Sequence, residues 1–149
     1  MTALAFYIHI GSLCVAVFGI FLADKSAFAW LRGKKETLSA RDIFIAHWIV
    51  AAGLCGLILS GLYLFWPLRT YLIGQPLFWL KIGFVLALII NSFYIDQLMH
   101  LALTRPYSAL SKRERMTLII SGMVSTLCWI GAFLAALILF QNVFIDFFL

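Results

Sequence analysis

The chain has 149 residues, of which 64% are hydrophobic and 11% are charged, and its mean hydropathy is +1.06. A soluble domain needs a polar outer layer that this composition does not supply, so the soluble classes are excluded. A helix that crosses the hydrocarbon core of a bilayer needs about 20 apolar residues. The composition therefore predicts an all-α integral membrane protein, a bundle of four transmembrane helices that forms a single domain over residues 1–149.

Four apolar runs predict the spans, at residues 3–23, 43–65, 77–103 and 116–140. Asp24 and Lys25 end the first run, and Trp66-Pro67 ends the second, because proline removes a backbone donor from a helix. Two short polar segments, 39–42 and 111–114, have the Ser-x-x-Asp/Glu pattern of a capping box. These segments predict the start of the second and fourth helices.

The basic residues are distributed unevenly along the chain, whose formal net charge is +5. Nine of the eleven lie in the first and third connections: Lys25, Arg32, Lys34, Lys35, Arg41, Arg105, Lys112, Arg113 and Arg115. These two connections share one side of the membrane, and the positive-inside rule makes that side cytoplasmic. We therefore expect a multi-pass protein of a bacterial inner membrane with both termini outside, in the periplasm. The charge reports topology, and a nucleic-acid partner is excluded.

Small and polar residues inside the runs predict where helices touch. They are Gly53, Gly56, Ser60 and Gly61 in the second span and Ser121, Gly122, Ser125 and Gly131 in the fourth. Such residues permit close backbone approach in lipid. Asn91, in the middle of the third span, needs a partner on a neighbouring helix. Cys14, Cys55 and Cys128 are isolated, which excludes a thiol–disulfide exchange pair.

Five ionisable residues lie within the spans: His9, His47, Lys81, Asp96 and His100. Such residues cost roughly 2.5–3.5 kcal/mol at mid-helix and tend to mark functional sites. By depth they form two groups. His9 and Lys81 belong to the outer half of the membrane, and the other three belong to the inner half.

In the inner group, His47 and His100 are expected at matched depth on two helices, where both imidazoles are candidate ligands of one haem iron. Asp96 precedes His100 by one helical turn and is a candidate to orient its ring. The alternative is that both histidines extend their polar tips to headgroup water.

In the outer group, His9 either forms a structural hydrogen bond to another helix or ligates a cofactor. Lys81 either faces the interior of the bundle or extends outward to the interface, since it lies about four residues from the end of its span. The sequence alone does not decide between the two alternatives for His9 or between the two for Lys81.

Two short segments carry a resemblance to known membrane proteins. Residues 6–12, Phe-Tyr-Ile-His-Ile-Gly-Ser, and residues 78–84, Phe-Trp-Leu-Lys-Ile-Gly-Phe, with Asn91 after them, resemble the corresponding helices of CopD-type and HemJ-type proteins. HemJ-type members are haem-b-binding protoporphyrinogen oxidases that depend on a first-helix histidine and on this lysine, so the resemblance assigns those roles to His9 and Lys81. CopD-type members are associated with copper uptake or resistance.

Three functions remain open from the sequence. The first is a haem-b-binding redox protein, an oxidoreductase that transfers electrons or performs a HemJ-like oxidation. Its partner is then a quinone or another membrane redox protein, with His9, His47 and His100 as candidate iron ligands. The second is a small transporter or copper-handling protein that uses the same polar residues. The third is a cofactor-free subunit of a larger membrane complex. Self-association into a homo-oligomer is left open in all three cases.

Overall fold

The computed structural model describes residues 2–148, except for the side chains of Thr2, Asp96 and residues 143–148. These residues form four long α-helices and one 3-10 turn, with no strand: α1 (Thr2–Leu31), α2 (Ala40–Ile73), α3 (Pro76–Thr104), η1 (Tyr107–Ala109) and α4 (Lys112–Phe148). All four α-helices are long and apolar enough to cross a membrane. The chain is therefore an all-α protein with the features of a multi-pass membrane protein, as the composition predicts.

The helices extend beyond the apolar runs that predict them. The predicted end of the first span at Asp24 is not the end of a helix, because α1 continues to Leu31. The helix also continues past Trp66-Pro67, where the second span is predicted to stop, since α2 contains Pro67 and ends at Ile73. The fixed φ of proline suits a helix, and the single hydrogen bond lost is tolerated where polar groups or water can replace it. With 30 residues in α1 and 34 in α2, these helices exceed the roughly 20 residues that the hydrocarbon core requires.

A glycine ends α1 through a Schellman motif. Gly33 has φ +69°, a left-handed conformation that favours glycine. The Lys34 amide donates to the Ala29 carbonyl at 2.9 Å, and the Gly33 amide donates to the Trp30 carbonyl at 2.9 Å. These are the two bonds that define the motif. The chain leaves the helix here and enters the basic first connection.

Both predicted capping boxes form, but only the second is reciprocal. The Glu114 amide donates to Ser111 Oγ at 3.3 Å, and the Ser111 amide donates to the Glu114 carboxylate at 2.7 Å. At the start of α2, the Asp42 amide donates to Ser39 Oγ at 3.4 Å. The Asp42 carboxylate lies instead 3.8 Å from Lys35 Nζ, which belongs to the first connection.

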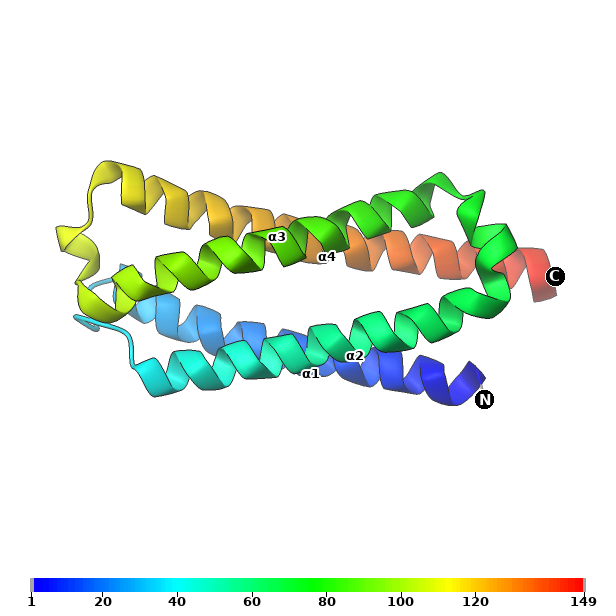
Figure 1. Cartoon of the computed structure of the whole chain (residues 1–149), viewed down its shortest axis with the longest axis horizontal. Helices are drawn as coiled ribbons and strands as arrows, with labels where there is room; N and C mark the ends of the chain where they lie inside the picture. Colours follow the sequence, from blue (N-terminus) through cyan, green and yellow to red (C-terminus); the bar gives the residue numbers. More distant parts are fainter. Residues whose placement is uncertain (1, 149) are drawn as a thin grey trace. The chain divides into compact units, whose positions relative to one another are not determined.

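The chain divides into two compact units. Unit 1 contains Met1–Arg69 and Leu101–Leu110, and unit 2 contains Thr70–His100 and Ser111–Leu149. Unit 1 thus holds α1, most of α2 and the end of α3. Unit 2 holds most of α3 and α4. In each unit the two long helices run antiparallel (Figure 1).

Unit 1 is built on a row of small residues between α1 and α2, which we call the α1–α2 seam. A Cβ on Gly53 would lie 2.6 Å from the backbone nitrogen of Ala16, and one on Gly19 would lie 2.9 Å from that of Val50. A Cβ on Gly56 would collide with the Ser12 side chain. The contacting residues on α1 are spaced three or four apart, and so are their partners on α2, which follow in the reverse order. One face of each helix therefore meets the other along an antiparallel seam. The predicted contacts at Gly53 and Gly56 are confirmed.

Unit 2 is held by a buried pair of polar side chains. Asn91 Nδ2 donates to the Ser121 carbonyl at 2.9 Å, and Ser121 Oγ donates to Asn91 Oδ1 at 2.9 Å. The predicted partner of Asn91 on a neighbouring helix is thereby confirmed. Gly131 is also a contact, since a Cβ there would lie 2.5 Å from the Phe84 ring, whereas the predicted contact at Gly122 is wrong because a Cβ there meets nothing within 4 Å.

Exposed tyrosine and tryptophan residues in unit 1 lie near the ends of the helices. Tyr7 is exposed near the start of α1, Trp48 near the start of α2, and Tyr63 and Trp66 toward the end of α2. At 1.5 Å per residue, Trp48 and Trp66 are about 27 Å apart. Aromatic side chains favour the membrane interface, and the hydrocarbon core is about 30 Å thick. The spacing therefore fits a bilayer.

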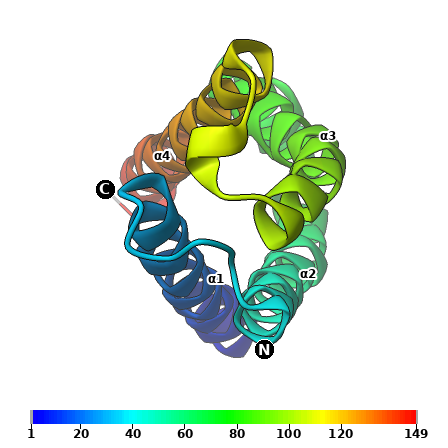
Figure 2. The ribbon, with the colours of Figure 1, turned by 90° about the vertical axis from the view of Figure 1, so that its left-hand side faces the viewer.

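The end of α3 returns to the first connection. The Leu38 amide donates to the Ala102 carbonyl at 3.0 Å, and the Trp30 indole N–H donates to the Arg105 carbonyl at 3.2 Å. The buried Trp30 ring also meets Tyr107 edge-to-face, with centroids 5.3 Å apart. Figure 2 looks onto this end of unit 1, where the two connections lie side by side. Both basic connections are therefore present at one end, as the charge pattern predicts.

Candidate functional site

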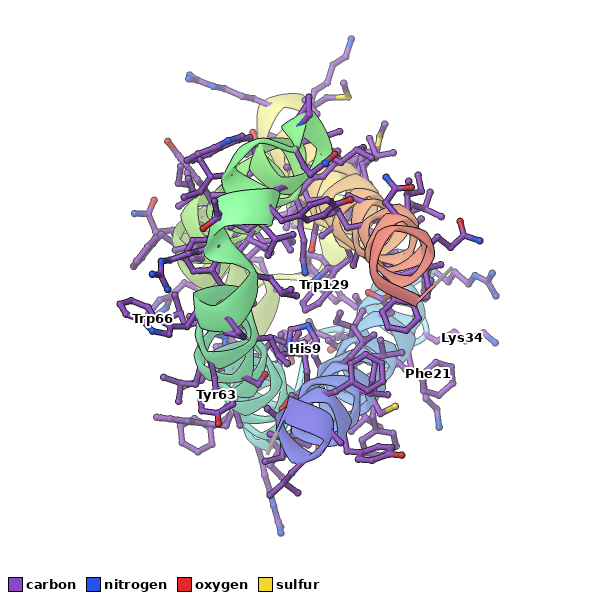
Figure 3. All side chains as sticks on the ribbon, turned by 90° about the vertical axis from the view of Figure 1, so that its right-hand side faces the viewer. His9, Phe21, Lys34, Tyr63, Trp66 and Trp129 are labelled. Atoms are coloured by element: carbon purple, nitrogen blue, oxygen red, sulfur yellow. The ribbon has the colours of Figure 1, made fainter. Side chains whose placement is uncertain are left out.

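His9 is the predicted site residue with the best defined surroundings. It lies on the face of α1 that meets α2, while Tyr63 and Trp66 project from the other side of α2 (Figure 3). Its imidazole Nδ1 is 2.8 Å from Oγ of Ser60, which is buried. The alternative of a hydrogen bond from His9 to another helix is thereby confirmed.

The Ser60 hydroxyl determines which His9 nitrogen carries the proton. A serine hydroxyl has one proton and two lone pairs. Ser60 directs that proton to the Gly56 carbonyl, 2.5 Å away and one turn earlier in α2. When the hydroxyl donates to that carbonyl, its oxygen can accept a hydrogen bond, and this arrangement favours the His9 tautomer with its proton on Nδ1. The lone pair is then on Nε2, the nitrogen that a metal ion would need.

The His9 ring packs against the backbone of α2. A Cβ on Gly61 would lie 3.5 Å from His9 Cε1, so the ring packs against a helix surface that has no side chain. Ser12, three residues after His9, packs against Gly56 in the same way. Ser60 and Gly61 both belong to the predicted small-residue contacts. Their pairing with His9 was not predicted, because the antiparallel register of the two helices is needed to find it.

His47 lies far from His9 within unit 1. Ser60 and His47 are 13 residues apart on α2, which corresponds to about 20 Å along the helix axis. Because His9 contacts Ser60, the two histidines are too distant to ligate a single iron. The pair His9/His47 is therefore removed from the candidate ligand sets. The His47 side chain is exposed.

Lys81 and His100 both belong to α3 in unit 2. They are 19 residues apart, or about 28 Å along the axis, so this pair is removed as well. Lys81 is half-buried and His100 is exposed. The Asp96 side chain lies outside the described residues, so its orientation of His100 stays a prediction. The inner iron site of His47 and His100 also stays a prediction.

No three His, Cys, Asp or Glu residues gather around a common point among the described side chains. A site for a bare copper or zinc ion commonly takes three or four protein ligands. A haem iron already has four porphyrin nitrogens and takes only one or two ligands from the protein. A single oriented histidine such as His9 is therefore compatible with the ligand needs of a haem iron.

A shallow hollow lies on α3 within unit 2. Among the described residues, its lining includes Ile90, Phe93, Tyr94 and Gln97. Ile90, Phe93 and Tyr94 are more than half exposed, so this face of the helix is open. The hollow combines an aromatic ring and an aliphatic side chain with a phenol and an amide. Both polar groups can donate hydrogen bonds.

Comparison of the chain with protein families, with characterised proteins and with solved structures gave no match. The site is therefore interpreted from its own residues.

Proposed function

We propose that this chain is a membrane-embedded haem-b-binding redox protein in which His9 would ligate the iron. The observation that carries the proposal is the 2.8 Å contact between His9 Nδ1 and Ser60 Oγ. Ligating histidines generally donate their second N–H to a nearby oxygen, which sets the tautomer and the ring orientation. Ser60 supplies that oxygen from within the membrane-spanning part of α2.

The residues around His9 have distinct tasks in this proposal. Ser60 holds the imidazole with Nε2 as the basic nitrogen, and Gly61 leaves space for the ring against α2. The α1–α2 seam prevents the two helices from sliding, because Gly53 contacts the backbone of Ala16. Haem b, when bound, supplies one-electron redox chemistry through its iron. Lys81 is the further residue that the HemJ-type resemblance assigns to this chemistry, as a ligand or in a HemJ-like oxidation.

The proposal includes an orientation in the membrane. Both termini lie on the periplasmic side of a bacterial inner membrane, and the two basic connections lie on the cytoplasmic side. The contacts of Trp30 and Leu38 with residues 102–107 support it, since they bring the two connections to one end. His9 is two residues from the exposed Tyr7, and so belongs to the periplasmic half. Fusions of alkaline phosphatase and of green fluorescent protein to each end and connection test this orientation.

A quinone is the electron partner that the α3 hollow favours. A quinone ring packs against aromatic and aliphatic side chains, here Phe93 and Ile90, and its two carbonyls accept hydrogen bonds. Tyr94 and Gln97 supply donors from the same face of the helix. Because this face is open, a lipid-soluble molecule can reach it from the bilayer. Another membrane redox protein is the remaining partner class.

Absorption spectroscopy tests the proposal. The full chain is produced with a supply of haem, purified in mild detergent, and measured oxidised and then reduced with dithionite. We expect a b-type spectrum whose Soret, α and β bands sharpen on reduction. A folded, full-length protein that stays colourless after haem supplementation overturns the proposal. A small transporter or a copper-handling protein remains the alternative function.

A further inference from the structure

Unit 1 brings together basic residues that are distant in the sequence. The first connection contributes Arg32, Lys34 and Lys35, and the segment after α3 contributes Arg105. All four are exposed. The two segments are joined by hydrogen bonds from Leu38 to Ala102 and from Trp30 to Arg105. Figure 3 shows Lys34 extending away from the ribbon. We call Arg32, Lys34, Lys35 and Arg105 the basic surface.

The charge of this region is not neutralised by its own acidic residues. Residues 24–42 with Arg105 contain six basic side chains and three acidic ones, Asp24, Glu36 and Asp42. Lys35 Nζ lies 3.8 Å from the Asp42 carboxylate, and both side chains are substantially exposed, so this pair is screened by solvent. A positive excess remains where the helices end.

We propose that the basic surface binds the headgroup of an anionic phospholipid. A phosphate diester accepts bidentate hydrogen bonds from arginine and point-charge contacts from lysine. Near an anionic membrane surface each basic side chain strengthens association by roughly fivefold. Phe28 is exposed one helical turn before Arg32, so an apolar side chain lies directly beside the charges. That combination fits a lipid, which has acyl chains, better than free phosphate.

The geometry of the site depends on Trp30. Its indole N–H holds the Arg105 carbonyl at 3.2 Å, and its ring meets Tyr107. The Trp30 carbonyl also accepts the hydrogen bond from the Gly33 amide at the turn that leads to Lys34 and Lys35. Losing the indole N–H leaves every charge in place but removes one of the two hydrogen bonds that join the segment of Arg105 to the first connection. Lipid binding at a defined arrangement of side chains is sensitive to that change, whereas general electrostatic attraction to a positive surface is not.

Native mass spectrometry of the purified full chain measures the proposed site. The probes are phosphatidylglycerol and phosphatidylcholine with identical acyl chains, added in competition in the same detergent. We expect the wild-type protein to retain phosphatidylglycerol preferentially. The triple variant Arg32→Gln, Lys34→Gln, Lys35→Gln should lose at least about tenfold of that preference. Trp30→Phe should lower it several-fold with no change in charge.

A matched control removes charge at the other end of the helices. Arg69 is exposed and contacts the Trp66 ring and carbonyl, so Arg69→Gln should leave the lipid preference unchanged. Helix content by circular dichroism verifies that each variant is folded. If Trp30→Phe does not fold, the triple variant of exposed side chains decides the question. An unchanged preference in the triple variant, or an equal loss in Arg69→Gln, overturns the proposal. Inorganic phosphate that competes as well as the lipid also overturns it.

Discussion

His9 Nδ1 and Ser60 Oγ, on two antiparallel membrane helices, lie 2.8 Å apart. The Ser60 hydroxyl donates a hydrogen bond to the Gly56 carbonyl of its own helix, which leaves its oxygen able to accept one from His9. This order of donors and acceptors places the His9 lone pair on Nε2. The hydrogen bond stabilises a side chain that the sequence marks as costly, and in the proposed function it would also orient that side chain as a ligand.

Ser60→Ala tests the orienting role of the serine. The variant removes the acceptor for His9 Nδ1–H while leaving His9 itself in place. We expect haem affinity to fall by roughly tenfold or more, as is typical when the partner of a ligating histidine is lost. Titration of haem into the haem-free protein measures this. Ser92→Ala is the matched control, since Ser92 Oγ donates only along its own helix, to the Ile89 carbonyl at 2.7 Å. Equal affinities in both variants would contradict the assigned role.

Gly53→Ala tests the α1–α2 seam. A Cβ at this position would lie 2.6 Å from a backbone atom of Ala16, which cannot move aside as a side-chain tip can. We expect a loss of stability of about 1–3 kcal/mol, the usual result of overpacking. Gly122→Ala, where a Cβ meets nothing within 4 Å, is expected to keep or raise stability. Thermal unfolding in detergent compares them, and a Gly53 variant as stable as the wild type would refute the seam.

The pair Asn91 and Ser121 is tested by a double-mutant cycle. The Ser121→Ala variant removes one of their two hydrogen bonds, and Asn91→Ala removes both. We expect a coupling energy of about 1 kcal/mol, within the range measured for polar contacts between membrane helices. Unfolding in mixed micelles supplies the four free energies. Additive effects would show that the pair does not stabilise unit 2.

Tyr94→Phe and Gln97→Leu test the α3 hollow as a quinone site. Each variant keeps the size and shape of the side chain roughly constant and removes a hydrogen-bond donor. We expect the Kd for a short-chain quinone, measured by quenching of tryptophan fluorescence, to rise several-fold. Tyr63→Phe is the control, because Tyr63 is an exposed tyrosine on α2. The quinone assignment fails if all three variants bind as the wild type does.

The predicted inner iron site has its own test. If His47 and His100 ligate one iron, either His47→Ala or His100→Ala removes that haem and leaves the spectrum of the His9 haem intact. Cys14→Ala, an exposed cysteine on α1, should leave every band unchanged. Spectra of variants purified in parallel decide this. A spectrum that is the same in both histidine variants and in the wild type excludes the inner site.

Sequence patterns predict what depends on local composition. Hydropathy is enough to find the four helices, and small residues are enough to find Gly53, Gly56 and Ser60 as contacts. Helix ends are predicted less well, because α1 and α2 continue past Asp24 and Pro67. A helix can keep its backbone hydrogen bonds outside the bilayer, so hydropathy marks the end of the apolar run and not the end of the helix. The His9–Ser60 bond joins residues 51 positions apart. It depends on the register between two helices, which neither helix determines alone.

The haem-to-chain ratio of the wild type and of His9→Ala is the most direct test of the central claim. Haem is quantified as the pyridine haemochrome, and protein by amino-acid analysis, in samples of equal helix content. We predict that His9→Ala lowers the ratio by one haem per chain. A His9→Ala protein that is folded and holds as much haem as the wild type would contradict His9 as a ligand.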